Sequence, residues 1–263
     1  MPNTFELFLF STDPQVIRTA DSAGVHGFIV DMENKGKQTR QTGYDTQINL
    51  NTIEDLKNAR SSTDREVICR INGFGEHTPA EVEQVISAGV DEILLPMVRH
   101  SKEVTHTLDF IHNRCKLGIL IETAEAVKAA STLGSLPLSR VYVGLNDLAI
   151  DRKTRCIFTS VADGTLEHIR SSIQQHFGFG GLTLPEKGHP IPCRLLAGEI
   201  TRLGCDFTFL RRSFFKDIAG HEMKVEIPRI LEFISECRAR SNAQVEKDHA
   251  EFADLVNTLE RSS

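Results

Sequence analysis

Short apolar runs alternate with amphipathic segments along most of the chain. The runs are rich in β-branched residues and end at polar positions, a pattern typical of buried parallel strands. Alternating strands and helices predict a parallel sheet with crossover helices, and eight such strands predict a closed (β/α)₈ TIM barrel. The expected strands are Thr4–Phe10, His26–Met32, Glu66–Ile71, Glu92–Pro96, Lys116–Ile121, Arg140–Gly144, Gly180–Leu184 and Asp206–Leu210. The expected helices between them are Asp13–Ala23, Thr52–Arg60, Pro79–Ala88, Lys102–Asn113, Ala124–Leu133, Gly164–Phe177 and Pro192–Leu203.

The C-terminal part of the chain is expected to be helical, with a break near Arg240–Asn242. Apolar residues at helical spacing occur on both sides of this break, and they give each helix one apolar face. We therefore divide the chain into a barrel over residues 1–222 and a C-terminal helical segment over 223–263. The second of these helices is additional to the eight helices of a (β/α)₈ barrel. It packs either on the outside of the barrel or on a partner subunit, and both arrangements stay open.

Length, charge and cysteine pattern exclude several classes of protein function. The chain has 263 residues, the usual size of one barrel, and a net charge of −6 without a long basic block, which argues against nucleic-acid binding. No long apolar stretch predicts a membrane span, and the first residues lack the pattern of a signal peptide. A cytoplasmic location is the default expectation. The six cysteines show no Cys-x-x-Cys pair and are expected to be reduced.

Four of the apolar runs stop at charged residues. One leads into Asp31 and Glu33, one into Arg70, one into Glu122, and one through Asn146 into Asp147. The carboxyl ends of parallel strands form the ligand-binding face of α/β folds. Carboxylates and a guanidinium that arrive there from separate strands predict a site for a metal ion and an anion.

Glu122 and Asp147 are the strongest candidate pair, because they follow consecutive strands and are expected at the same mouth of the barrel. Two carboxylates, completed by water and substrate oxygens, suit Mg²⁺ or Mn²⁺. Each residue also has a structural interpretation. Glu122 could offset a helix dipole, and Asp147 could be an N-cap.

Arg70 and Arg211 are candidate anion ligands. Arg70 ends a buried strand, where a charge requires an anionic partner, and its planar donors suit a carboxylate or an enolate oxygen. The alternative is an internal salt bridge with Asp31 or Glu33. Arg211 follows the eighth strand, where many barrels bind anions; here the alternative is a surface charge or an intersubunit bridge.

Several of these blocks resemble the HpcH/HpaI aldolase and citrate lyase β-subunit family, part of the phosphoenolpyruvate/pyruvate superfamily of TIM barrels. The resemblance runs through residues 4–150, over the blocks Gly27–Glu33, Arg70–Asn72, Glu92–Val98, Ile121–Ala126 and Val143–Ala149. It implies that Glu122 and Asp147 bind a divalent metal, Mg²⁺ or Mn²⁺. It also implies that Arg70 holds the carboxylate or enolate of a pyruvate-like unit. Beside Arg70, we expect Asn146 and Arg211 as further substrate contacts.

The reaction that the resemblance implies is reversible carbon–carbon cleavage through a metal-stabilised enolate. The substrates would be a 2-oxo acid and an aldehyde or acyl partner, and the protein would be a homo-oligomer supported by its C-terminal helix. Two alternatives remain. One is citrate-lyase-like cleavage of an acyl thioester. The other is a barrel with impaired catalysis that binds a metabolite or serves as an assembly subunit.

One position departs from the aldolase branch of the family. That branch has a histidine directly after the acid that corresponds to Glu33, whereas this chain has Asn34. An amide does not titrate in a useful range and cannot act as a general base. Asp31 and Glu33 would then assist catalysis by orienting a metal-bound water or the base. The polar loop Lys35–Asn51 is expected over the same face, and the candidate proton carriers in it are Lys35, Lys37, Arg40 and Tyr44.

Overall fold

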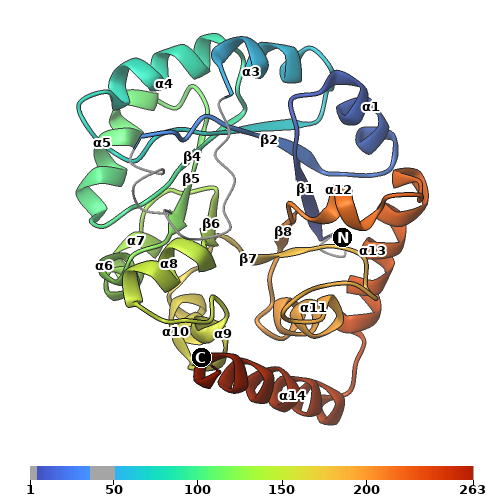
Figure 1. Cartoon of the computed structure of the whole chain (residues 1–263). Helices are drawn as coiled ribbons and strands as arrows, with labels where there is room; N and C mark the ends of the chain where they lie inside the picture. Colours follow the sequence, from blue (N-terminus) through green and yellow to red (C-terminus); the bar gives the residue numbers. More distant parts are fainter. Residues whose placement is uncertain (1–4, 36–50, 263) are drawn as a thin grey trace.

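The computed structural model describes residues 5–35 and 51–262. Within these residues, eight parallel strands pair in chain order and β8 pairs with β1, which closes the barrel. Figure 1 looks into the barrel with the helices around its outside. The predicted fold class is therefore confirmed. The strands are β1 Glu6–Phe10, β2 Gly27–Asp31, β3 Glu66–Arg70, β4 Glu92–Leu95, β5 Lys116–Ile121, β6 Arg140–Val143, β7 His176–Leu182 and β8 Phe207–Leu210.

Helices connect the strands and cover the barrel. Some begin at side-chain caps that the local sequence provides: Asp13 accepts hydrogen bonds from the N–H groups of Gln15 and Val16 at the start of α1, and Thr52 forms a capping box at the start of α3. The helices are α1 Pro14–Ser22, α3 Ile53–Arg60, α4 Thr78–Ser87, α5 Ser101–Ile111, α6 Ala124–Lys128, α7 Ala130–Gly134, α8 Leu145–Arg152, α9 Thr159–Ala162, α10 Thr165–Ser172, α11 Cys193–Arg202, α12 Phe214–Asp217, α13 Met223–Arg238 and α14 Asn242–Arg261.

Two hydrophobic clusters hold the barrel together. The larger cluster lies between the strands and the surrounding helices. The smaller one fills the barrel interior, where aromatic rings meet edge to face, as Phe8 does with Phe207 at 6.0 Å between ring centroids. Its buried members are Phe8, Ile29, Ile68, Leu94, Leu120, Phe207 and Phe209. The barrel is thus a packed core, and a ligand has access only at its two ends.

The seventh strand and the helix before it differ from the prediction. The helix expected over Gly164–Phe177 ends at Ser172, and the strand begins at His176 instead of Gly180. Phe177 is fully buried in the outer cluster, while Gly178 lies against Phe207: a Cβ atom there would be 2.4 Å from the Phe207 carbonyl oxygen. Gly178, on the inner face, therefore interrupts the alternation of apolar side chains that identifies a strand.

The C-terminal helices pack against the same chain. α13 contacts α1 and α11, and α14 contacts α9 and α11 along the outside of the barrel (Figure 1). The division at residue 222 and the association with a partner subunit stay predictions. Among the described residues, no helix combines the length and apolar character needed to cross a membrane.

Candidate active site

The predicted site residues arrive at the carboxyl end of the barrel from separate strands. Asp31 and Arg70 are the last residues of β2 and β3, and they are paired directly in the strand register. Glu122 follows β5, and Asp147 is the third residue of α8, directly beyond β6. Because β5 and β6 are neighbours, Glu122 and Asp147 lie at adjacent positions of one mouth.

Arg70 forms the internal salt bridge that the sequence left open as an alternative. Its Nε and Nη2 atoms each donate to one oxygen of Asp31 at 2.8 Å, and Nε lies 3.6 Å from a Glu33 oxygen. The Asp31 and Glu33 side chains are almost fully buried. Burial lowers the pKa of Arg70, but the Asp31 charge and hydrogen bonds outweigh it and hold the pKa above its usual value. The guanidinium therefore stays cationic and fixed in one plane.

Glu122 is held by two features of its surroundings. The N–H of Met97 donates to its Oε2 at 3.0 Å, and Met97 has a φ of 55°, a left-handed conformation that is rare outside glycine. On the other side, a Cβ atom on Gly144 would lie 2.3 Å from Oε1 of Glu122. The carboxylate therefore occupies space that only a glycine at position 144 leaves open. Strained backbone of this kind is often found at functional sites.

The charges of two other carboxylates, Asp147 and Glu33, act on Glu122. Burial raises the pKa of Glu122 to about 8, with further contributions from the charges of Asp147 and Glu33 and an opposing one from Arg70. Glu122 and Asp147 are 4% and 6% exposed. Two buried carboxylates that repel each other are stabilised by a cation between them.

The donor set fits a hard divalent ion that takes part of its shell from other molecules. Among residues 5–35 and 51–262, no three His, Cys, Asp or Glu side chains are arranged to hold a metal ion on their own. Mg²⁺ commonly uses one or two carboxylates and completes its shell with water and substrate oxygens. Asp147 is not an N-cap, because Gly144 occupies that position of α8. The metal role of both residues stays a prediction.

The two further predicted substrate contacts are Asn146, directly before Asp147 in α8, and Arg211, directly after β8. Asn146 is exposed in the first turn of α8. The Arg211 side chain donates from Nη2 to the carbonyl of His189 at 3.1 Å, so it holds the loop after β7. Neither residue has a hydrogen bond to Arg70 or Glu122 in the described part of the chain. Their substrate roles stay predictions.

Asn72 organises the position where the family histidine is replaced. Its Oδ1 accepts hydrogen bonds from the backbone N–H groups of Asn34 and Lys35 at 2.9 and 2.7 Å, and its Nδ2 donates to Glu81 at 2.6 Å. Asn72 thereby fixes the backbone directly after Glu33. The sequence showed Asn72 within the Arg-Ile-Asn block, but nothing in the sequence assigned it this role. Lys37, Arg40 and Tyr44 lie outside the described residues.

An aromatic wall that the sequence did not reveal stands beside the charged residues. Tyr142 stacks on Phe209 at 4.1 Å between ring centroids, and Phe209 meets Phe10 edge to face at 5.3 Å. The centroid of the Phe10 ring lies 5.8 Å from the Arg70 guanidinium carbon. Burial, with a smaller contribution from the Glu122 charge, raises the pKa of Tyr142, whose hydroxyl donates to the Gly180 carbonyl. The wall closes the barrel interior beneath the site.

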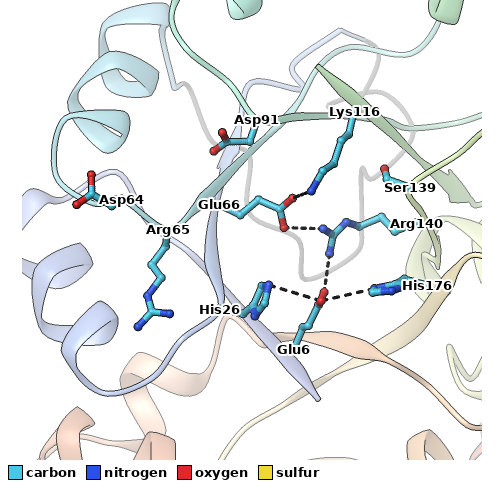
Figure 2. Close-up of a pocket in the computed structure, with 10 residues that line it drawn as sticks. All are labelled: Glu6, His26, Asp64, Arg65, Glu66, Asp91, Lys116, Ser139, Arg140 and His176. Carbon is cyan, nitrogen blue, oxygen red and sulfur yellow. Dashed lines mark hydrogen bonds and ion pairs between the residues drawn. The ribbon is translucent and has the colours of Figure 1, made fainter. Parts of the chain in front are cut away.

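A cavity of about 650 Å³ lies at the opposite end of the barrel, where the strands begin (Figure 2). Arg140 is buried there, with Nε within 2.8 Å of both Glu92 oxygens and Nη2 2.6 Å from Glu66. Its guanidinium carbon also lies 4.5 Å from the centroid of the Phe8 ring. Burial raises the pKa of Glu92 to about 7. In such barrels this end serves stability, whereas the carboxyl end carries the chemistry. We therefore place the candidate site at the mouth with Arg70 and Glu122.

Comparisons with known proteins identify the family and the fold of the chain. The family model described as HpcH/HpaI aldolase/citrate lyase matches residues 4–175. A search of curated proteins found no match. Among solved structures, a HpcH/HpaI aldolase/citrate lyase family protein from Burkholderia cenocepacia J2315 has 12% sequence identity and a TM-score of 0.61, over 79% of this chain and 88% of that one.

Two further structures share the fold. Citrate synthase SbnG has 15% identity and a TM-score of 0.60, over 83% of this chain and 91% of that one. A citrate lyase beta subunit from M. tuberculosis, complexed with oxaloacetate and magnesium, has 15% identity and a TM-score of 0.59, over 88% of this chain and 98% of that one. At these identities the likeness concerns the fold alone.

Proposed function

Because the chain belongs to the HpcH/HpaI aldolase/citrate lyase family, we propose that it is a divalent-metal-dependent carbon–carbon lyase that acts on a 2-oxo acid. The observation that carries the proposal is the pair of buried carboxylates, Glu122 and Asp147, at the same mouth as the fixed guanidinium of Arg70. A cluster of this composition suits a cation together with an anionic substrate.

Glu122 and Asp147 are the residues that would hold Mg²⁺ or Mn²⁺. A bound ion would supply Lewis-acid stabilisation of the negative charge that develops when a carbon–carbon bond next to a 2-oxo acid breaks. The Met97 N–H and the space at Gly144 keep the Glu122 carboxylate in place before any ligand binds. Such preorganisation avoids a reorganisation cost during the reaction.

Arg70 would bind the substrate carboxylate. Asp31 engages Nε and Nη2, while Nη1 has no hydrogen bond to another residue in the described part of the chain. The bidentate contact with Asp31 sets the plane of the guanidinium and leaves Nη1 to meet an anion. Arg70 thus combines the internal salt bridge with a substrate contact.

Glu33 is the better candidate of the two acidic residues for moving a proton. Both oxygens of Asp31 accept hydrogen bonds from Arg70, which stabilise its ionised form and disfavour proton uptake by Asp31. One oxygen of Glu33 lies 3.6 Å from Nε of Arg70. Asn34 does not titrate, and Asn72 holds its backbone. We propose that Asp31 orients Arg70 and that Glu33 acts with a group of the following loop.

Citrate-lyase-like cleavage of an acyl thioester is the second candidate. Asn34 favours this second candidate, since citrate-lyase-like members also lack the histidine at that position. The Asn72 side chain fixes the turn that contains Asn34 and favours the same candidate. The two candidates differ in the substrate. An aldolase releases pyruvate from a 4-hydroxy-2-oxo acid without coenzyme A, whereas a citrate-lyase-like enzyme requires an acyl thioester.

Thermal unfolding of the metal-stripped protein tests the proposal. With Mn²⁺ present, we expect oxalate, a mimic of the pyruvate enolate, to raise the Tm of the parent, and we expect this effect to vanish in Glu122→Gln. Glu83→Gln, which changes an exposed carboxylate, is the matched control and should behave as the parent. A parent without any Tm response to Mn²⁺ and oxalate contradicts the proposal. A parent that responds but cleaves neither substrate class indicates an impaired barrel that only binds a metabolite.

A further inference from the structure

The end of the C-terminal helix holds the chain segment that follows the proposed metal-binding helix. Glu260, in the last turns of α14, accepts hydrogen bonds from the backbone N–H groups of Arg155 and Cys156 at 3.0 and 2.8 Å, and from the Thr159 hydroxyl at 2.8 Å. The two backbone hydrogen bonds, followed by that of Thr159, lower the pKa of Glu260. Glu260 is therefore ionised near neutral pH. Its hydrogen bonds connect residues that lie more than one hundred positions apart in the chain.

The held segment is the continuation of α8, the helix that carries Asp147. At the C-terminal end of α8, Asp151 accepts a hydrogen bond from the Ala124 N–H at 2.7 Å, and Arg152 donates to the Ser160 hydroxyl at 2.9 Å. One contact ties α8 to the start of α6 and the other ties it to α9. The turn between α8 and α9 has no regular helix or strand of its own. Glu260 satisfies two of its backbone N–H groups.

α14 is itself anchored firmly enough to serve as a support. Phe252 is fully buried and meets Phe158, in the same turn, edge to face at 6.2 Å. On the next face of α14, His249 contacts the buried Glu199 of α11 at 3.1 Å. Figure 1 shows α14 alongside α9 and α11, with the C-terminus next to α9. Apolar packing and polar contacts together make α14 part of the wall around α8 and α9.

We propose that Glu260 is a positioning residue for Asp147: it fixes the turn after α8 and thereby holds α8 in the orientation that presents Asp147 to the site. The metal-binding part of this inference rests on the proposed function. Residues that support metal ligands from outside typically change metal affinity by about 10–100-fold when they are replaced. Since Glu260 acts through a turn and a helix, we expect the lower end of this range.

The test compares Glu260→Ala with Glu251→Ala. Glu251 lies on the same helix and pairs with Arg194 of α11, so its replacement perturbs α14 without touching the turn. Amide hydrogen exchange of residues 145–159 and Mn²⁺ affinity, measured from the free-ion electron paramagnetic resonance signal, are the readouts. We expect Glu260→Ala to accelerate exchange in both the turn and α8 and to weaken Mn²⁺ binding about tenfold, while Glu251→Ala leaves both unchanged. Glu260→Gln, which retains one acceptor oxygen, should give an intermediate result and serves if Glu260→Ala does not fold.

The remaining outcomes separate this inference from the proposed function. Faster exchange confined to the turn, with exchange in α8 and Mn²⁺ affinity at the parent level, overturns the inference and leaves Glu260 a local structural contact. A parent that binds no Mn²⁺ contradicts the proposed function. The exchange of α8 in Glu260→Ala then decides by itself whether Glu260 positions Asp147.

Discussion

Gly144 and Glu122 share a space that holds either a Cβ atom or a carboxylate oxygen: a Cβ on residue 144 would lie 2.3 Å from Oε1 of Glu122. The nearest atoms all belong to the Glu122 side chain, which is buried and also held by Met97. A side chain at position 144 would therefore have to displace the carboxylate. This relationship links the glycine directly after β6 to the proposed metal ligand that follows β5.

Gly144→Ala should weaken Mn²⁺ binding by at least about tenfold while the protein stays folded, because displacing one ligand of a metal ion is comparable to disturbing its supporting shell. The measurement is Mn²⁺ titration, with circular dichroism to monitor folding. Gly73→Ala is the control, since its Cβ would make only an ordinary contact at 3.5 Å with Met97. Parent-like affinity in Gly144→Ala would argue against Glu122 as a metal ligand.

Arg70→Lys should lose affinity for oxalate and keep affinity for Mn²⁺. Lysine cannot bind Asp31 through two parallel hydrogen bonds and still present a third donor in the same plane. We expect a loss on the order of 2 kcal/mol, about 30-fold, the scale of a charge-assisted hydrogen bond. Isothermal titration calorimetry of oxalate at saturating Mn²⁺ measures it. Equal oxalate affinity in parent and variant would remove Arg70 from the substrate site.

Asn72→Asp should destabilise the protein by about 2 kcal/mol, because it places a carboxylate 2.6 Å from that of Glu81 while retaining the acceptor for the Asn34 and Lys35 N–H groups. Adding Glu81→Gln supplies the missing donor, and we expect the double variant to recover more than half of the loss. Urea unfolding of the parent and the three variants measures the coupling. Additive effects of the two substitutions would contradict the proposed hydrogen-bond arrangement.

The raised pKa of Glu92, at the opposite end of the barrel, predicts that the free energy of unfolding depends on pH. Burial raises its folded-state pKa from 4.5 to about 7, so its contribution to the free energy of unfolding is fully present below about pH 4.5 and is lost as the pH rises through 7. The difference corresponds to on the order of 3 kcal/mol. Relative to Glu92→Gln, the parent should therefore lose stability between pH 5 and pH 8. Unfolding at several pH values measures this difference.

The control for the Glu92 prediction is Glu83→Gln. Glu83 is exposed, and its hydrogen bonds with Arg114 lower its pKa, so it does not titrate between pH 5 and pH 8. We expect the stability difference between this variant and the parent to be independent of pH in that range. A Glu92→Gln variant whose pH profile runs parallel to that of the parent would mean that Glu92 stays ionised throughout.

Much of the fold could be predicted because each barrel strand carries its own signal. Seven of the expected strands overlap closely with those of the structure, and the lysine-to-isoleucine run of β5 has the same bounds, Lys116–Ile121. The strand predicted over Gly180–Leu184 missed the first residues of β7, because Gly178 leaves its side of the strand to Phe207 and Gly180 leaves its side to Leu196 of α11. The residues that fill the space beside these two glycines come from β8 and from α11, so the local sequence does not reveal them.

For the candidate site too, the sequence predicted one part and the tertiary structure decided the other. The sequence by itself determined that Asp31, Arg70, Glu122 and Asp147 would reach one mouth, because parallel strands end on the same side of a barrel. Tertiary structure decided how they are used there. The register of β2 and β3 set Arg70 against Asp31, burial next to two other carboxylates raised the pKa of Glu122, and the docking of α14 brought Glu260 to the turn after α8. These relationships depend on distances between residues far apart in the chain, which local patterns of polarity do not encode.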